Sequence, residues 1–362
     1  MISNAIKDKY MQRCIELAKQ GMGNTTPNPM VGAVIVYENK IIGEGYHQKC
    51  GEAHAEVNAI NAVKDKELLK KSTLYVNLEP CSHFGKTPPC ANLIARLKIP
   101  EVIIGTKDTA SHVSGKGIEI LKNAGCKVTT GVLEKESREL NKRFFTFHER
   151  KRPYIILKWA ETLDGYIDVL RSENDPVAPT WITNEFSKML VHKWRAEEQA
   201  ILIGTNTAKA DNPTLTTRNW PGKNPLRVVI DRDIKLSSHL NAFNKEAETI
   251  VVADISKKIN SVNYSNKNVG IDFVDYNLRY FDKQLVEIFV GNNIQSVIIE
   301  GGSKILNYFI TNDLWDEARV FIGSKKFIKG IHAPHINGKV VKEEILGNSK
   351  LLFINNETIF SQ

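Results

Sequence analysis

The amino-acid sequence predicts an α/β protein with two domains, each built around its own sheet. The chain has 362 residues, which exceeds the size at which one hydrophobic core usually stops growing. Helical and strand-like apolar patterns alternate along both halves, as in sheets that contain parallel strands. The composition, with 42% hydrophobic and 25% charged residues, is that of ordinary globular proteins and excludes a disordered chain.

Residues 1–149 are expected to form the first domain. The segment from Ala5 to Gln20 has the periodicity of an amphipathic helix and ends at Gly21. A hairpin that turns around Glu38 to Lys40 follows. The remaining predicted elements are a helix from about His54, a strand at 72–80, a helix with Thr87 as N-cap and Pro88 as first residue, a strand at 101–106, a helix at 117–125, a strand at 127–129 and a charged helical stretch at 133–150.

Residues 150–362 are expected to form the second domain, because the alternation of strand-like and helical segments restarts after Lys151, Arg152 and Pro153. Buried strands are predicted at 154–160, 200–204, 226–231, 248–253, 296–300 and 317–323, with helices at 184–198 and 281–292. These strands are numerous enough for a separate α/β sheet.

Charge and cysteine content narrow the classes of function. The net charge of +8 suits nucleic acid or small phosphorylated molecules, but the basic residues are scattered, which favours an ordinary solvated surface. No apolar run reaches the roughly 18–20 residues of a membrane span, and charges occupy the place of a signal peptide's apolar stretch, so we expect a cytosolic protein. Five cysteines in such a chain argue against a disulfide framework and for thiols or metal ligands.

Four residues in two segments predict a catalytic zinc site in the first domain. "HAE" at 54–56 and "EPCSHFGKTPPC" at 79–90 follow the His-x-Glu and Pro-Cys…Cys order of zinc-dependent base deaminases. His54, Cys81 and Cys90 would bind one zinc ion and leave its fourth position open. Glu56 would not be a ligand but would carry the proton between a zinc-bound water and the departing amine. Taken singly, the cysteines could be buried small hydrophobic residues and the histidine a core residue.

The positions of these residues on helices fit the same interpretation. The beginning of a helix directs His54 and Glu56 into one cleft, and Cys90 in the opening turn of another helix is favoured as a thiolate. The other thiols, of Cys14, Cys50 and Cys126, are interpreted as ordinary cysteines.

The two ligand cysteines are separated by eight residues, where cytidine and many other deaminases have two. His83 and Lys86, carried in this longer segment, could contact a substrate group that nucleosides lack, such as a phosphate. A loop that is merely longer remains the alternative.

Four segments of the first half share their pattern with a known family, namely "NPMVGAVIV", "GYHQKCGEAHAE", "LEPCSHFGKTPPC" and "SGKGIEILKNAG". With them, the first half resembles the deaminase part of the bifunctional deaminase/reductase family of riboflavin biosynthesis. The resemblance implies a cytidine-deaminase-like three-layer domain whose substrate is a pyrimidine with a phosphoribosylamino group. By position, base, ribose or phosphate would be held by Asn28, His47, Lys86 and also His83. One departure is Ala110, which stands where the family has a substrate-binding asparagine, while Asp108 is kept.

Two segments of the second half suggest a phosphate-binding site, although no GxGxxG follows its first strand. After the strand at 296–300, Glu300, Gly301 and Gly302 lead into a helix whose N–H groups could approach a pyrophosphate. After the strand at 200–204, "TNTAKADNPTLTTR" supplies Thr207, Asp211 and other polar residues. A tight turn and a capped helix explain these segments equally well.

The second half also resembles the family, in its reductase part. The resemblance rests on "LKWAETLDGYID", "WIT", "VHKWRAEEQAILIGTNTAKADNPTLTTR", "LRVVID" and "IIEGGSKIL". It implies a dihydrofolate-reductase-like α/β domain that uses NADPH. By position, the cofactor would be contacted by Ala160, Trp181, Thr207, Asp211, Gly302, Ser303, Lys304, Ile305, Leu306, Asn307 and Tyr308, and the phosphorylated substrate by Arg195, Leu215, Arg218 and Glu300. The sequence departs from the family pattern in two places. The segment "DVLRSENDPVAPTWIT" around Pro179 is longer, and Thr162 stands in place of a serine.

We therefore expect a bifunctional enzyme that deaminates the pyrimidine and then reduces the ribose with NADPH. The resemblance implies a homodimer or homotetramer, and neither nucleic acid nor a membrane is an expected partner. Two alternatives remain at this stage. One is a nucleic-acid-editing deaminase, for which a two-residue cysteine spacing and a clustered basic or aromatic face would be typical. The other is a deaminase with a non-catalytic C-terminal module.

Overall fold

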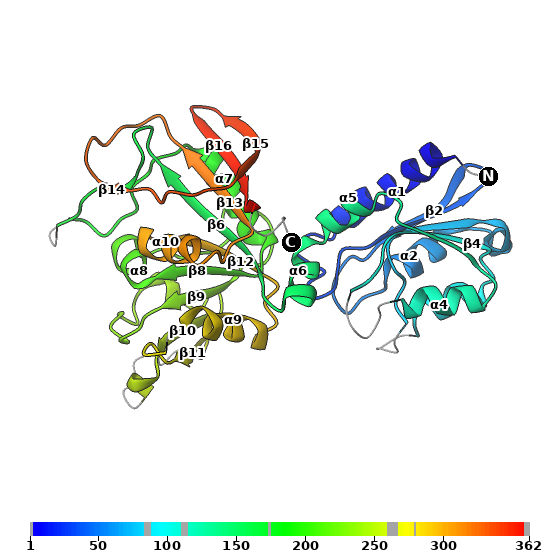
Figure 1. Ribbon diagram of the computed structural model, residues 1–362, viewed down its shortest axis with the longest axis horizontal. Helices are drawn as coiled ribbons and strands as arrows, with labels where there is room; N and C mark the ends of the chain where they lie inside the picture. The colour runs from blue at the N-terminus through cyan, green and yellow to red at the C-terminus, as the bar shows by residue number, and fades with distance from the viewer. Residues whose placement is uncertain are drawn as a thin grey trace. The chain divides into compact units, whose positions relative to one another are not determined.

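The computed structural model describes residues 3–82, 88–109, 115–172, 175–258, 267–278 and 280–357. The chain forms two compact units, Met1–Lys151 and Arg152–Gln362, and each contains its own sheet (Figure 1). The predicted α/β class is confirmed in both units.

The first unit has a five-stranded sheet in the order β2-β1-β3-β4-β5. Strand β1 pairs antiparallel with β2 and β3, and β3, β4 and β5 are parallel. The elements are α1 (Asn4–Lys19), β1 (Gly32–Tyr37), β2 (Lys40–Tyr46), α2 (Ala55–Ala62), a 3₁₀ helix (Lys66–Lys71), β3 (Thr73–Leu78), α3 (Cys90–Arg96), β4 (Glu101–Thr106), α4 (Lys116–Asn123), β5 (Lys127–Thr130), α5 (Glu134–Leu140) and α6 (Lys142–Arg150).

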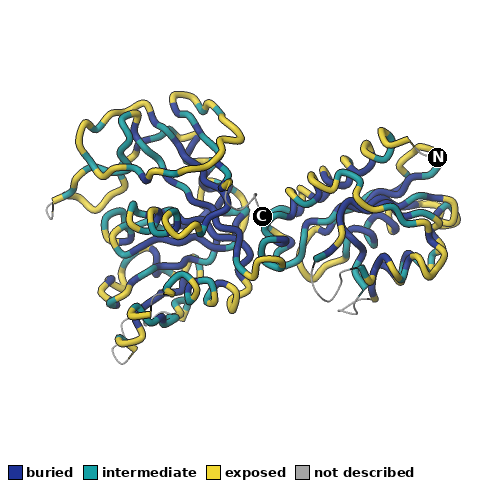
Figure 2. Tube along the Cα trace, in the orientation of Figure 1, coloured by how far each residue is buried: buried dark blue, intermediate teal, exposed yellow. Residues whose placement is uncertain are grey.

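Helices cover both faces of this sheet and make three layers. Because side chains alternate across a strand, Ile35 packs with α2, α3 and α4 on one face, whereas Val34 packs with α1 and α5 on the other. The central strands β1, β3 and β4 are almost entirely buried, whereas the edge strands β2 and β5 and the outer faces of the helices are partly exposed (Figure 2). This arrangement leaves the N-terminal ends of α2 and α3 close to the end of β3.

The start of α3 corrects one sequence prediction. Pro88 was expected to be the first helical residue, but the helix begins at Cys90 with Pro89 as its N-cap, and the expected N-cap Thr87 lies outside the described residues. The physical reason is local, since a residue before a proline is disfavoured in the helical region, and Pro88 precedes Pro89. Cys90 therefore lies in the opening turn, as predicted.

The second unit has a nine-stranded sheet in the order β11-β10-β9-β8-β12-β6-β13-β16-β15. Neighbouring strands from β11 to β13 are parallel, and β16 and β15 add an antiparallel edge. The elements are β6 (Tyr154–Glu161), β7 (Tyr166–Asp168), α7 (Glu185–Glu197), β8 (Ala200–Gly204), α8 (Thr205–Asp211), β9 (Leu226–Ile230), a 3₁₀ helix (Asn241–Phe243), β10 (Thr249–Asp254), β11 (Val269–Val274), α9 (Phe281–Gly291), β12 (Ser296–Gly301), α10 (Ser303–Thr311), β13 (Glu317–Ile322), β14 (Ile331–His332), β15 (Lys339–Leu346) and β16 (Ser349–Asn355).

The central strands of this sheet place polar residues at one edge. Strands β8, β12 and β6 are adjacent and parallel, and their middles are fully buried. The carboxyl ends of parallel strands meet at the same edge, which is where open α/β sheets bind ligands. Thr205, at the end of β8, and Gly301, at the end of β12, therefore lie at this edge.

A glycine contact in the first unit gives a stability prediction. A Cβ added at Gly117 would overlap the carbonyl oxygen of Pro80, because α4 approaches the chain directly before Cys81 at backbone distance. Overpacking of this kind costs typically about 1–3 kcal/mol. We expect Gly117→Ala to lower the free energy of unfolding of the first unit by this amount in urea titrations. Gly291→Ala, where a Cβ would meet nothing within 4 Å, is the control; equal unfolding midpoints for the two variants would contradict the contact.

Candidate active sites

The three predicted zinc ligands come together in the first unit. His54 is the N-cap of α2, Cys81 follows β3, and Cys90 is the first residue of α3. The Nδ1 atom of His54 lies 3.5 Å from the Sγ of Cys81 and 3.4 Å from the Sγ of Cys90, and the three ligand atoms all lie within 4.8 Å of one another. Ligands of a tetrahedral zinc with ordinary bond lengths are about 3.6 Å apart. The donor set and its geometry therefore fit a zinc ion with three protein ligands.

The surroundings of Cys81 stabilise a thiolate. The backbone N–H of Cys90, at the beginning of α3, donates to the Sγ of Cys81 at 3.3 Å. Hydrogen bonding from the Cys90 thiol and from His54 outweighs burial and lowers the pKa of Cys81 to about 4. The pKa of Cys90 is raised, because it shares a proton with Cys81 and is buried. A metal ion replaces that shared proton when both thiols ionise as ligands.

Glu56 lies in the first turn of α2, two residues after His54, and its side chain is buried. Burial, reinforced by the negative charge of Cys81, raises its pKa to about 7. A carboxyl group with a pKa near the working pH is suited to accept and return a proton. The arrangement thus provides a proton carrier beside the three ligands.

Asn28 and His47 form a second polar pair next to the cluster. The Nδ2 of Asn28 donates to the Nε2 of His47 at 3.1 Å, and the Nδ1 of His47 faces the carbonyl oxygen of Ala53 at 3.1 Å. The ring of His47 packs edge-on against that of His54, with centroids 5.3 Å apart. Burial lowers the pKa of His47, which favours the neutral imidazole, and the contacts of its two ring nitrogens fix the orientation of the ring.

Three other predicted positions of this domain lie outside the described residues, namely His83, Lys86 and Ala110. Asp108, in the same predicted substrate segment as Ala110, is buried.

Glu79 is a residue of this site that the sequence analysis missed. Its side chain is buried two residues before Cys81. The carboxylate accepts four backbone N–H groups, from Asp108 at 3.3 Å, Gly115 at 3.1 Å, Gly117 at 3.0 Å and Ile118 at 3.3 Å. It thereby joins the segment that carries Cys81 to the beginning of α4. The only signal in the sequence was an acidic residue next to the Pro-Cys motif, where a carboxylate is easily interpreted as exposed.

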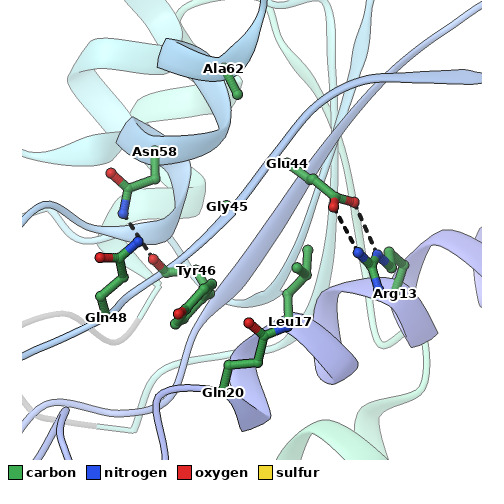
Figure 3. A pocket seen from close by; sticks show the side chains of 9 residues that line it. All are labelled: Arg13, Leu17, Gln20, Glu44, Gly45, Tyr46, Gln48, Asn58 and Ala62. Carbon is green, nitrogen blue, oxygen red and sulfur yellow. Dashed lines mark hydrogen bonds and ion pairs between the residues drawn. The ribbon is translucent and has the colours of Figure 1, made fainter.

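A surface pocket of about 530 Å³ lies beside the edge strand β2, between α1 and α2 (Figure 3). The ion pair of Arg13 and Glu44, whose closest atoms are 2.7 Å apart, forms part of its lining. Asn58 donates to the carbonyl oxygen of Tyr46 on the opposite side. None of the nine residues that line it belongs to the zinc cluster, so the pocket is not part of that site.

In the second unit, the turns after β8 and β12 are joined directly. The backbone N–H of Gly302 donates to the Oγ1 of Thr207 at 2.7 Å, and a Cβ at Gly302 would lie 3.2 Å from that oxygen. A Cβ at Gly204 would overlap Ile305, so α10 packs tightly on the end of β8. Because the first N–H groups of a helix have no partner within it, the start of α10 at Ser303 can receive phosphate oxygens.

A buried ion pair lies beside these turns. Arg195, on α7, and Glu300, near the end of β12, contact each other through two bonds, and the shorter is 2.7 Å. The Nη1 of Arg195 also donates to the carbonyl oxygen of Thr216 at 3.3 Å. Burial alone would raise the pKa of Glu300, but Arg195 and Lys158 outweigh it and lower the pKa to about 2. Lys158, which the sequence analysis did not single out, has a pKa lowered by burial.

The remaining predicted reductase residues differ in how they are exposed. The side chains of Leu215 and Leu306 are 1% exposed and belong to the core, so a ligand could reach them only through the backbone. Trp181 is 50% exposed, and Arg218 is exposed. The others, which are at least partly accessible, are Ala160, Asp211, Ser303, Lys304, Asn307 and Tyr308.

Comparisons with known proteins identify both units. Residues 5–106 match the family model of the cytidine and deoxycytidylate deaminase zinc-binding region, and residues 153–331 match that of the RibD C-terminal domain. The chain is therefore a two-domain enzyme that combines a deaminase with a reductase.

Relatives over nearly the whole length specify the family. The riboflavin biosynthesis protein RibD of Aquifex aeolicus is 40% identical over 345 residues, which cover 94% of this chain and 93% of the relative. That of Bacillus amyloliquefaciens is 38% identical and covers 91% and 88%. The chain belongs to the RibD family of bifunctional riboflavin-biosynthesis enzymes.

Solved structures of similar proteins indicate the same family. A diaminohydroxyphosphoribosylaminopyrimidine deaminase/5-amino-6-(5-phosphoribosylamino)uracil reductase from Thermotoga maritima has a TM-score of 0.87 at 35% identity, with coverage of 97% of this chain and 99% of that one. RibD of Acinetobacter baumannii has a TM-score of 0.86 at 29% identity, with coverage of 98% and 99%.

These matches confirm the predicted fold class, the bifunctional activity and the link to riboflavin biosynthesis. They favour neither the nucleic-acid-editing deaminase nor the non-catalytic C-terminal module. A zinc ion in the first domain, a nicotinamide cofactor in the second and a small-molecule substrate are consistent with them. Among the described residues, no helix is both long and apolar enough to cross a membrane.

The pKa of Glu300 gives a pH-dependent stability prediction. A carboxyl group whose folded pKa is lowered from 4.5 to about 2 stabilises the fold above pH 4.5, and this contribution is lost as the pH falls toward 2. The shift corresponds to about 3 kcal/mol. We expect Glu300→Gln to lower the free energy of unfolding at pH 7 by this order, and the deficit to shrink by about 1 kcal/mol at pH 4. Urea unfolding at both pH values measures it.

The control for this measurement is Glu287→Gln, which changes an exposed glutamate on α9 and should stay within about 0.5 kcal/mol of the unmodified chain. A deficit for Glu300→Gln that is the same at pH 7 and pH 4 would show that ionisation of Glu300 does not stabilise the fold.

Proposed function

We propose that residues 1–149 deaminate a pyrimidine that carries a phosphoribosylamino group, and that residues 150–362 then reduce the ribose of the product to a ribityl chain with NADPH. The observation that carries the proposal is the partly buried cluster of His54, Cys81 and Cys90 with the buried Glu56 beside it. The deaminase and reductase activities of the similar Thermotoga maritima protein support the choice of substrate.

In the deamination, His54, Cys81 and Cys90 would hold one zinc ion. A zinc ion bound in this way supplies Lewis acidity that makes water nucleophilic near neutral pH. Glu56 accepts the proton of the attacking water and returns it to the departing amino group, for which a pKa near 7 is well matched. The Asn28–His47 pair, held in one orientation by its hydrogen bonds, contacts the base, and Lys86 contacts the phosphate.

In the reduction, the chain binds and orients two partners. Bound NADPH would supply a hydride for the ribose carbon. The beginning of α10 would hold its pyrophosphate, with contacts to the cofactor from Gly302 to Tyr308, and Thr207, Asp211, Ala160 and Trp181 would contact other parts of the cofactor. No protein nucleophile is required, because the protein contributes position and electrostatics.

The ribose phosphate of the substrate is held by basic residues near Glu300. Arg218 is exposed and free to turn toward a phosphate, whereas Arg195 is fixed by Glu300 and presents a charge in a defined place. Arginine is suited to this role because its planar fork can bind two oxygens. The proposal includes assembly as a homodimer or homotetramer in the cytosol, without nucleic acid, and light scattering of the purified chain measures the assembly.

Glu56→Gln tests the deaminase assignment. The variant should keep about one zinc per chain, since the three ligands remain, and should lose ammonia release by a factor of about 10²–10⁴, because the proton carrier is gone. Metal analysis and an ammonia assay measure the two quantities. Glu52→Gln, on the exposed surface before α2, is the control; ammonia release from Glu56→Gln at the rate of this control would remove Glu56 from the mechanism.

The separate placement of the two chemistries gives a second test. Arg218→Ala should raise the KM for the deaminated substrate about ten- to a hundredfold, as loss of a charge-assisted phosphate contact does, and leave deamination unchanged. Chelation of zinc should stop ammonia release and spare the reduction of substrate that has already been deaminated. Lys223→Ala, on the exposed loop near β9, is the control. If Arg218→Ala stopped deamination as fully as reduction, the assignment of separate sites would be wrong.

A further inference from the structure

The guanidinium group of Arg171 donates six hydrogen bonds to three segments of the second unit. It follows β7, and its side chain is 17% exposed. Its Nε donates to Asp168 at 3.1 Å, its Nη1 to the carbonyl oxygens of Ala178 at 2.6 Å and Ala210 at 3.1 Å, and its Nη2 to Asp168 at 3.2 Å, Thr180 at 3.1 Å and Asp211 at 3.2 Å. All three guanidinium nitrogens are used.

These bonds connect three separate segments of the backbone. One is the end of β7 at Asp168, the second is the pair Ala178 and Thr180, and the third is the C-terminal end of α8 at Ala210 and Asp211. Thr180 closes the network, since its Oγ1 donates to Asp168 at 2.6 Å. A cation at Ala210 is favourable because the last carbonyl groups of a helix are unpaired and carry partial negative charge.

Two of the joined pieces carry residues that we assign to the cofactor. Asp211 is bonded directly, and Trp181 follows Thr180 in the chain. We propose, as an extension of the function proposed above, that Arg171 is a positioning residue of the reductase, which holds Asp211 and the backbone at Ala178–Trp181 in the places where they contact NADPH.

The electrostatics of Asp211 support this role. Burial raises its pKa to about 6, Arg171 and Lys158 act in the opposite direction, and Asp168 adds to the rise. Without Arg171, the pKa of Asp211 would increase further, so a larger fraction of the carboxyl group would be protonated at pH 7. A protonated carboxyl group loses its charge-assisted acceptor bonds to hydroxyl or amide groups of the cofactor.

Two variants separate the charge of Arg171 from its shape. Arg171→Gln removes the charge, and Arg171→Lys keeps it but cannot bridge several partners with one planar group. In the full chain, titrated with NADPH and followed by fluorescence, we expect Arg171→Gln to raise the Kd about tenfold or more, which is the effect of one lost charged hydrogen bond. The KM for NADPH should rise in parallel, and kcat should change less.

The pH profile distinguishes positioning from general weakening of the fold. NADPH binding by the unmodified chain should weaken as the pH falls through about 6. In Arg171→Gln this loss should begin at higher pH, and in Arg171→Lys it should stay near the original pH while the Kd remains raised. Lys283→Gln, which removes an exposed positive charge from α9, should change neither quantity.

Deamination by the same samples should be unchanged, because it belongs to the first unit, and urea unfolding of the second unit is the control for folding of the Arg171 variants. If the unmodified chain binds NADPH and both Arg171 variants bind it with the same Kd and pH profile, the role of Arg171 is overturned while the proposed reductase function stands. If the unmodified chain does not bind NADPH, the proposed function itself fails. Should Arg171→Gln unfold, a raised Kd in folded Arg171→Lys supports the proposal and an unchanged Kd rejects it.

Discussion

A buried charge in a protein requires hydrogen-bonding partners, and both candidate active sites of this chain are organised by that constraint. The carboxylate of Glu79 is surrounded by four backbone N–H groups, and this brings α4 against the segment that ends in Cys81. In the second unit, Glu300 is held by Arg195, which in turn fixes the carbonyl oxygen of Thr216. In both cases the residue that satisfies the charge also determines where the neighbouring backbone lies.

The two units place their functional groups at the same kind of position, although their sheets differ. Each places reactive or binding groups where a parallel strand ends and a helix begins: Cys81 and Cys90 after β3, and Thr207 and Gly302 after β8 and β12. Strand ends supply a rigid base, and helix beginnings supply N–H groups and a favourable field for thiolates or phosphates. Close backbone approach is possible because glycines occupy the contact points, as at Gly117 and Gly302.

The zinc cluster could be predicted from the sequence because its residues form two short motifs with distinctive chemistry. His54, Cys81 and Cys90 needed only the correct order and a helix start, and the structure brings them together. Glu79, Lys158 and Arg171 could not be found in this way. Their roles depend on partners 29 to 40 residues away, as between Glu79 and Asp108 or Arg171 and Asp211, or on burial, which a single charged letter does not reveal.

The fold shows the same division between local and distant information. Runs of apolar residues indicated the buried parallel strands, but not the edge strand β15, since most of β15 is exposed and has no apolar pattern to detect. The start of α3 was misplaced by two residues because the effect of Pro89 on Pro88 outweighed the usual preference for proline at a helix start. Leu215 and Leu306 were assigned to ligand contacts by position, and only the three-dimensional packing shows that their side chains belong to the core.

The strand order of the second sheet has a consequence for synthesis of the chain. Strand β6, the first of this unit to be made, lies between β12 and β13, which are made last among the parallel strands. On the ribosome, more than half of the second unit must be synthesised before the strands that pair with β6 exist, whereas the first unit is complete by then. Because pairing between distant segments is slow and leaves strand edges exposed meanwhile, β6 is a strand whose edges stay unpaired while most of the second unit is made.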